Sequence, residues 1–272
     1  MSFDVEQFVR YQISNAQLRT YPFPHFYVHP VFPPDFYDQL LAHLPPTEIL
    51  SRIGEGGSVG KLDADGNKIS GSDQPRYIGD LAVLEEHEQS TSGGDLWAGI
   101  SQWLLGDEFR DLIIGRFEQG VRERFGSDVK LRTQVDGRYV RDFTKYSIGP
   151  HTDTPRKLVS LLFYLPRDES MRHLGTSIYS PIDPEFRCEG NRWHDFGSFR
   201  KIATMEFLPN SLLGFFKTDR SFHGVEVIDD ADIERNVLLY NIYVNKVITR
   251  GPAKAAAAPA GRWWPWARGA QH

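Results

Sequence analysis

The feature that most constrains the fold is a series of short apolar segments that begins near residue 129. They are rich in Val, Ile, Leu, Tyr and Phe, and Gly, Pro and Asp turns separate them, as is typical of β-strands. Eight candidate strands follow one another: VKLRTQV, RYVRDFTKYSI, KLVSLLFYLP, TSIYSP, RKIATMEFLP, SLLGFF, HGVEVI and NVLLYNIYV. So many short strands in one stretch predict a β-sandwich or a jelly roll.

The residues before this β-rich region predict helices. Residues 4–19 and 94–125 carry apolar side chains at helical spacing, and prolines open and close the segment 33–46. The aromatic, Pro-bounded segment 22–32 predicts a strand. We therefore expect a mainly β fold with flanking N-terminal helices.

The chain is expected to form one domain over residues 1–250, with N-terminal elements at 1–126 and a jelly-roll core at 127–250. Residues 51–80 are polar and hold seven glycines. A loop of that length is often a lid, and we hypothesise that it covers the site; surface decoration is the alternative. The tail 251–272, rich in Ala, Trp and Arg, is either a disordered end or a docking segment.

Composition excludes several classes of partner. A net charge of −5 argues against a non-specific nucleic-acid binder, and no run of about 20 apolar residues could span a membrane. Residues 1–10 contain no apolar core typical of a signal peptide. The single cysteine, Cys188, excludes an internal disulfide and fits a reducing compartment. We expect a cytoplasmic protein with neither nucleic-acid nor membrane partners, and the sequence leaves the oligomeric state open.

Three candidate metal ligands stand at strand ends. His151 and Asp153 are two residues apart, so in an extended segment they point to the same face. His223 follows the apolar run SLLGFF, at the start of another predicted strand. Two imidazoles and one carboxylate leave three positions open on a metal, which is the ligand set of non-haem Fe(II) oxygenases. Taken alone, His-x-Asp is common by chance, and a histidine that caps a turn is the alternative.

Arg235 opens the last predicted strand, twelve residues after His223. Its planar guanidinium suits a carboxylate, although a solvated strand-end charge is the alternative. The ordered motifs YSIGPHTD, LVSLLFYLP, GTSIY, FHGVEVI and ERNVLLYNIY resemble the iron(II)/2-oxoglutarate-dependent oxygenase superfamily, and within it the prolyl 4-hydroxylase-like branch. The resemblance covers residues 21–245, with its strong motif matches in 139–245.

The resemblance implies a double-stranded β-helix and a set of roles. His151, Asp153 and His223 would bind Fe(II). Arg235 and Tyr164 would bind the distal carboxylate of 2-oxoglutarate, and Tyr146 would line the cosubstrate pocket; ordinary core tyrosines are the alternative for the last two. The implied activity is that of a dioxygenase that uses O2 and 2-oxoglutarate to hydroxylate an unactivated C–H bond, releasing succinate and CO2.

The sequence is least specific about the substrate. The resemblance implies a small-molecule, amino-acid or prolyl-type substrate, free or peptidyl. Arg156 and Arg141 flank the His-x-Asp motif and would favour an anionic group, with a solvated face as the alternative. Two positions depart from the family pattern: Gly175-Thr176 replaces a Gly-Gly turn, and no Ser or Thr stands two residues after Arg235.

The alternative hypothesis is that the protein is not an enzyme but a non-catalytic β-sandwich module that binds a glycan or a protein. It predicts no iron binding and an exposed platform of Tyr and Trp. The His151, Asp153 and His223 set, in the expected order, argues against it.

Overall fold

The computed structural model describes residues 5–53, 61–62, 68–69, 75–190 and 192–249. The helices are α1 (Val5–Asn15), α2 (Pro34–Ala42), α3 (Leu81–Thr91), α4 (Leu96–Leu104), α5 (Asp107–Arg116) and α6 (Glu118–Phe125), with short 3-10 turns η1 (Thr47–Ile49), η2 (Glu169–Met171) and η3 (Phe196–Ser198). The strands are β1 (His25–Val28), β2 (Ser51–Arg52), β3 (Lys61–Leu62), β4 (Lys68–Ile69), β5 (Arg76–Asp80), β6 (Val129–Phe143), β7 (Ile148–His151), β8 (Lys157–Tyr164), β9 (Thr176–Pro181), β10 (Phe199–Met205), β11 (Ser211–Phe216), β12 (His223–Val225) and β13 (Glu234–Thr249).

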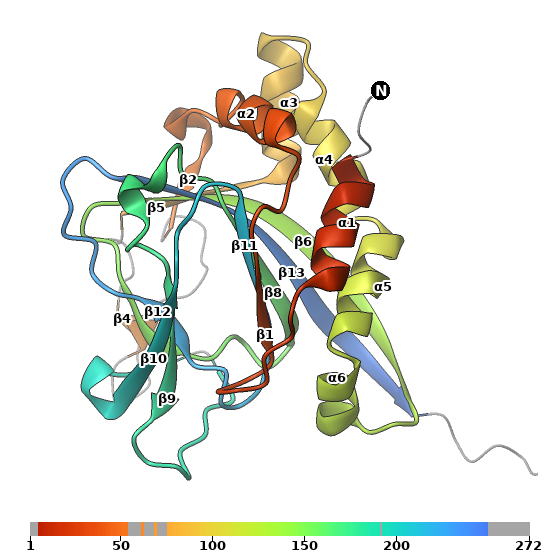
Figure 1. Cartoon of the computed structure of the whole chain (residues 1–272), viewed down its shortest axis with the longest axis vertical. Helices are drawn as coiled ribbons and strands as arrows, with labels where there is room; N and C mark the ends of the chain where they lie inside the picture. The colour runs from red at the N-terminus through yellow and green to blue at the C-terminus, as the bar shows by residue number, and fades with distance from the viewer. Residues whose placement is uncertain (1–4, 54–60, 63–67, 70–74, 191, 250–272) are drawn as a thin grey trace, which may run out of the picture.

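Two antiparallel sheets face each other (Figure 1). The larger has the order β1-β11-β8-β13-β6-β5-β2, the smaller has the order β10-β9-β12-β7, and β3 and β4 form a separate hairpin. Along the chain, β6, β8, β11 and β13 of the large sheet interleave with β7, β9, β10 and β12 of the small one. This alternation between two sheets is the jelly-roll arrangement, so the predicted fold class is confirmed.

Helices cover the outer face of the large sheet, which makes the molecule three layers deep (Figure 1). Because side chains alternate along each strand, the large sheet contributes to two apolar cores. One lies between the helices and the large sheet, and the other lies between the two sheets. On β13, Leu238 and Tyr240 pack toward the helices in the larger cluster, whereas Val237 joins Tyr164 and Phe215 between the sheets. The inner face of the large sheet is therefore the face that meets the small sheet.

The structure corrects the strand boundaries predicted near residue 137. VKLRTQV and RYVRDF belong to one continuous strand, β6, and IGPH forms a separate strand, β7. Asp136 and Gly137, which separate the two predicted strands in the sequence, lie within β6 and pair with β13. The glycine allows close packing, because a Cβ at Gly137 would lie 2.4 Å from Leu81 Cδ1.

The N-terminal part contributes more than helices. Its predicted strand at 22–32 is β1, and the chain adds β2 and β5 to the large sheet, within the segment interpreted as a loop. Residues 54–60, 63–67 and 70–74 of that segment lie outside the described residues, as does the tail 251–272, so the lid and docking hypotheses stay untested. The region predicted to be helical, 94–125, contains three helices, α4, α5 and α6.

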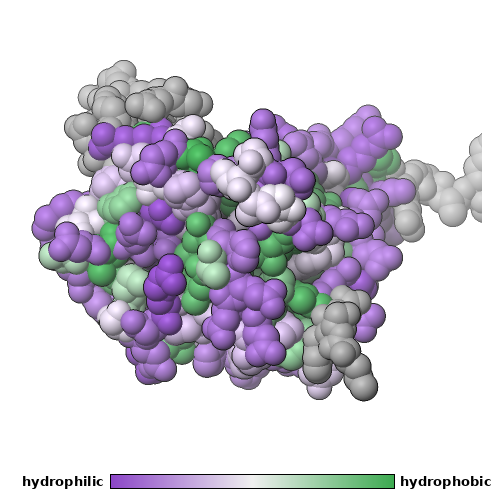
Figure 2. Space-filling view, turned by 90° about the horizontal axis from the view of Figure 1, so that it is seen from above, coloured by the Kyte–Doolittle hydropathy of each residue, from purple (hydrophilic) through white to green (hydrophobic). Residues whose placement is uncertain are grey.

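The end of the molecule that carries α2, α3 and α4 is mostly hydrophilic, with hydrophobic residues scattered among polar ones (Figure 2). None of the described helices is both long enough and apolar enough to cross a membrane.

Candidate metal centre

Strand pairing brings the two predicted histidine ligands together. His151 ends β7 and His223 begins β12, and the two residues are direct cross-strand partners. Their ring centroids lie 4.3 Å apart. Asp153 follows β7 and completes the group, in which one ligand atom from each residue lies within 4.8 Å of the others.

Backbone carbonyls orient both imidazoles. His151 Nδ1 lies 3.0 Å from Gly149 O, and His223 Nδ1 lies 2.9 Å from Ser221 O. A carbonyl oxygen only accepts hydrogen bonds, so in each neutral ring the proton is on Nδ1 and the lone pair on Nε2. Each histidine thus keeps Nε2 as its metal-binding atom.

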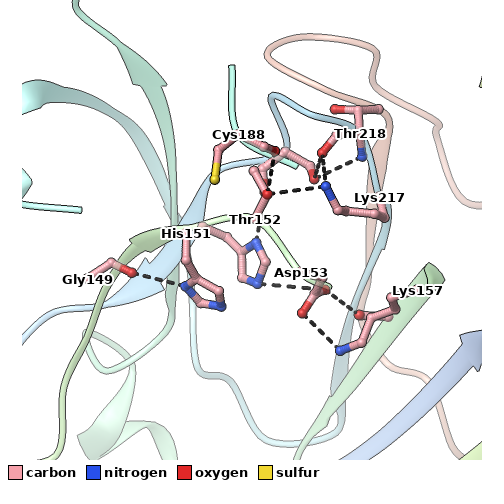
Figure 3. A network of polar contacts seen from close by, with 11 residues as sticks. Gly149, His151, Thr152, Asp153, Lys157, Cys188, Lys217 and Thr218 are labelled. Carbon is pink, nitrogen blue, oxygen red and sulfur yellow. Dashed lines mark hydrogen bonds and ion pairs between the residues drawn. The ribbon is translucent and has the colours of Figure 1, made fainter. Parts of the chain in front are cut away.

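Two side chains hold the Asp153 carboxylate. Lys157 Nζ donates to Oδ1 at 2.9 Å, and Ser160 Oγ donates to Oδ2 at 2.8 Å. Figure 3 shows Lys157 beside Asp153, with His151 on the other side of the carboxylate. Both donors come from the first half of β8, so the sheet itself fixes the orientation of this ligand.

The protonation states suit metal binding. Burial, aided by the nearby His223, lowers the pKa of His151 to about 3, and burial also lowers the pKa of His223. Burial opposes ionisation of Asp153, but the charge and the hydrogen bond of Lys157 help to hold its pKa below the ordinary value. At neutral pH the group therefore presents two neutral imidazoles and a carboxylate, which fit a divalent first-row metal.

A buried network fixes the turn between the ligands (Figure 3). Thr152 Oγ1 donates to the carbonyl of Cys188 at 2.8 Å and accepts from Lys217 Nζ at 3.2 Å. Burial lowers the pKa of Lys217 to about 8. Gly190, at φ +128°, packs against the same turn, and a Cβ there would lie 2.1 Å from Asp153 O. The segment around 188–190 thus supports the ligand turn from one side.

The metal centre opens into a cavity of about 260 Å³ between the two sheets. Arg235 lines it and is almost fully buried. Arg235 Nε donates to Leu174 O at 2.7 Å and Nη1 donates to Asp142 Oδ2 at 2.7 Å. One cavity therefore contains both the candidate metal ligands and the arginine predicted to bind the cosubstrate.

The two predicted tyrosines differ in position. Tyr146 lines the cavity, and the guanidinium of Arg76 lies 4.0 Å from its ring centroid. Tyr164 is fully buried beneath Arg235, 5.8 Å from ring centroid to guanidinium carbon, and its hydroxyl accepts from Thr176 N at 3.3 Å. Tyr164 therefore contacts the residues around the cavity rather than lining it.

The two arginines predicted to bind substrate lie elsewhere. Arg141 shares the helix-side face of β6 with Tyr139, where its guanidinium donates to Asn236 Oδ1 at 2.9 Å and to Pro45 O at 2.9 Å. Arg156 is exposed and donates to Asn245 Oδ1 at 2.6 Å. Neither is among the described residues that line the cavity, and their predicted contact with the substrate stays untested.

The alternation of side chains along β6 explains the position of Arg141. A shift of one residue moves a side chain to the other face, and neighbouring basic residues occupy the cavity instead. Arg138 and Lys157 line it, together with Arg192 from the loop before β10.

Sequence reasoning missed Arg76 and Asp142; the Asp142 carboxylate contacts the guanidinium groups of both Arg76 and Arg235. Arg76 lies in RYIGD, whose short alternating pattern predicts a strand, but it follows a polar, glycine-rich stretch that we interpreted as loop. Asp142 is directly opposite Arg235 in the register of β6 and β13, which no local pattern reveals.

Comparisons with known proteins give matches only among solved structures. No protein family and no curated protein matches the chain. The chain is similar to a Pseudomonas putida prolyl-4-hydroxylase, at 14% identity and TM-score 0.44 over 88% of this chain and 98% of that one. It is also similar to HygX from Streptomyces hygroscopicus, solved with nickel and 2-oxoglutarate, at 12% identity and TM-score 0.41 over 80% of this chain and 82% of that one.

A third similar structure is EvdO2 from Micromonospora carbonacea var. aurantiaca, complexed with 2-oxoglutarate. It shares 14% identity at a TM-score of 0.41, over 89% of this chain and 92% of that one. The fold and the site described above rest on the strand order and the side-chain geometry of this chain.

Proposed function

We propose that the protein is an Fe(II)- and 2-oxoglutarate-dependent dioxygenase. The observation that carries the proposal is the convergence of His151, Asp153 and His223 on a cavity that Arg235 also lines. Three protein ligands leave room on the metal for a chelating cosubstrate and for dioxygen.

Each residue of the site has a separate role in this proposal. Bound iron would supply the activation of dioxygen, with 2-oxoglutarate as the reductant that leaves as succinate and CO2. The carbonyls of Gly149 and Ser221 keep Nε2 of both imidazoles directed at the metal. Lys157 and Ser160 hold the Asp153 carboxylate in one orientation, which reduces the reorganisation needed when the metal binds.

The other end of the cavity is proposed to bind the cosubstrate. Arg235 would bind the distal carboxylate, since its Nη2 has only a long contact, 3.4 Å, to Thr176 Oγ1. Tyr146 would line the cosubstrate pocket. Tyr164 would position Arg235 and Thr176 through its contacts with both residues. Apolar walls that include Val237, with Phe215 near the metal, would exclude water from the reacting atoms.

The cavity also limits the substrate. Ligand pockets usually measure about 300–1,000 Å³, so a cavity of about 260 Å³ favours a small molecule or a single side chain of a peptide. Arg138, Lys157 and Arg192 line it and favour a substrate with an anionic group. We propose hydroxylation of a C–H bond in such a substrate, in a reducing compartment such as the cytoplasm, which suits Fe(II) and the free Cys188.

The proposal is tested by anaerobic titration of Fe(II) and 2-oxoglutarate into metal-free protein. We expect a weak visible charge-transfer band from the chelate, no band in Asp153→Ala, and a weaker band in Arg235→Ala. An absence of any band in the wild type, with no thermal stabilisation by either additive, would overturn the proposal in favour of a non-catalytic binding module.

A further inference from the structure

The predicted cosubstrate arginine has a buried carboxylate as its neighbour. Asp142 has no exposed surface and is the cross-strand partner of Arg235 in the β6–β13 pairing. Its Oδ2 accepts from Arg235 Nη1 at 2.7 Å. An ion pair of this kind leaves no net charge, so Arg235 and Asp142 alone provide a poor site for a dicarboxylate.

Arg76 changes this charge balance. Asp142 is also the cross-strand partner of Arg76 in the β5–β6 pairing, and it accepts from both Nε and Nη2 of Arg76, the latter at 2.9 Å. Two guanidinium groups and one carboxylate give +1 + 1 − 1 = +1. The cluster thus carries the single positive charge that one incoming carboxylate neutralises.

The position of Arg76 shows that this charge faces the cavity. Arg76 lines the cavity with 18% of its side chain exposed, compared with 2% for Arg235. Nε and Nη2 of Arg76 donate to Asp142, and Nη1 is the guanidinium nitrogen that Asp142 does not contact. The guanidinium also packs over the ring of Tyr146, another residue that lines the cavity.

We infer that Arg76 gives the cluster of Arg76, Asp142 and Arg235 the net positive charge that binds the distal carboxylate of 2-oxoglutarate, because Asp142 and Arg235 alone carry none. The inference rests on the proposed function and adds to it a residue from β5, in the N-terminal part of the chain. Asp142 holds two like-charged groups side by side before the ligand arrives, so little reorganisation accompanies binding.

The experiment compares two ligands in calorimetric titrations with Mn(II) bound in place of iron. One ligand is 2-oxoglutarate and the other is 2-oxobutyrate, which keeps the chelating oxo-acid group but lacks the distal carboxylate. Wild type should prefer 2-oxoglutarate by roughly 10- to 100-fold, the worth of charge-assisted hydrogen bonds to one carboxylate.

Three variants test the charge balance. Arg76→Met should lose most of the preference and keep its affinity for 2-oxobutyrate and for Mn(II). The double variant Arg76→Met/Asp142→Asn should regain most of the preference, because Arg235 is no longer neutralised. Arg156→Met, on the exposed surface outside the cavity, is the matched control and should behave as wild type.

The outcomes separate the inference from the proposed function. A preference that survives Arg76→Met, an equal loss of affinity for both ligands, or no recovery in the double variant overturns the role of Arg76 while the proposed function stands. If Arg76→Met does not fold, Arg76→Lys and the double variant test the inference instead. Both should keep the preference for 2-oxoglutarate over 2-oxobutyrate, and loss of that preference in either one overturns the role of Arg76. Wild type that binds neither ligand in the presence of Mn(II) overturns the proposed function, and the inference with it.

Discussion

Metal binding by this site should depend only weakly on pH in the acidic range. Metal ligation needs both imidazoles neutral. The pKa of His151 is about 3 and that of His223 is below its ordinary value, both because of burial. His151 faces the cavity and is part-exposed there, but protein atoms surround that cavity, so a charged ring remains poorly solvated.

The expected magnitude follows from these pKa values. An imidazole with the ordinary pKa of 6.5 costs about 30-fold in apparent affinity between about pH 7.5 and pH 5, and two such groups cost about 1,000-fold. His151 stays neutral over this range, so only His223 contributes. We expect the apparent affinity to fall by less than about 30-fold.

The assay is a competition titration of Co(II) against a chelator of known pH dependence, at several pH values. His173→Gln is the matched control, because His173 is exposed and pairs with Asp230 at 2.9 Å, outside the cavity. A fall of about 1,000-fold in the wild type would refute the argument that burial keeps both imidazoles neutral.

The same burial predicts a loss of stability in the metal-free protein as the pH falls. The unfolded state binds a proton at His151 below about pH 6.5, whereas the folded state does not until about pH 3. The free energy of unfolding should therefore drop by about 2 kcal/mol from this group between pH 7 and pH 5. Asp153 does not contribute in this window, because its depressed pKa matters only below the ordinary value of 3.8. Denaturant titrations of metal-free protein measure the change, and a flat profile would contradict it.

Three further single variants test other parts of the structure. Ser160→Ala removes a donor to Asp153 and should weaken Co(II) binding about 10-fold; an unchanged dissociation constant would show that Lys157 alone holds this carboxylate. Arg141→Met should lower the free energy of unfolding by about 2–3 kcal/mol without changing Co(II) affinity, and weaker metal binding in this variant would contradict its placement on the helix side. Gly190→Ala should cost about 1–3 kcal/mol in denaturant titrations and weaken Co(II) binding, because its Cβ would displace the backbone of Asp153; wild-type values would refute that close contact.

The sequence predicts much of this architecture because its signals are local. Apolar runs and turn residues identify most strands of the jelly roll, and the spacing of His151 and Asp153 places both at one strand end. The sequence also predicts His223 as the third metal ligand, because it stands at the start of another strand. The structure brings these three side chains together through the pairing of β7 with β12.

The remainder depends on register, which local patterns do not encode. Arg141 and Arg138 differ only in which face of β6 they occupy, and the basic run in the sequence does not reveal the face. The cluster of Arg76, Asp142 and Arg235 requires three strands in one alignment, with partners separated by 66 and 93 residues. Gly137 shows the opposite problem, since a glycine that permits close packing looks like a turn residue.

The place of β13 in the large sheet has a consequence for how the chain folds. This strand is the last one described, yet it lies in the middle of the sheet, between β8 and β6. Until it is inserted, the two halves of the sheet have no common partner, and Arg235 is not beside Asp142. Such long-range pairing makes folding slow. The arginine cluster is complete only once β5, β6 and β13 have paired, so binding of a dicarboxylate would report that this part of the sheet has assembled.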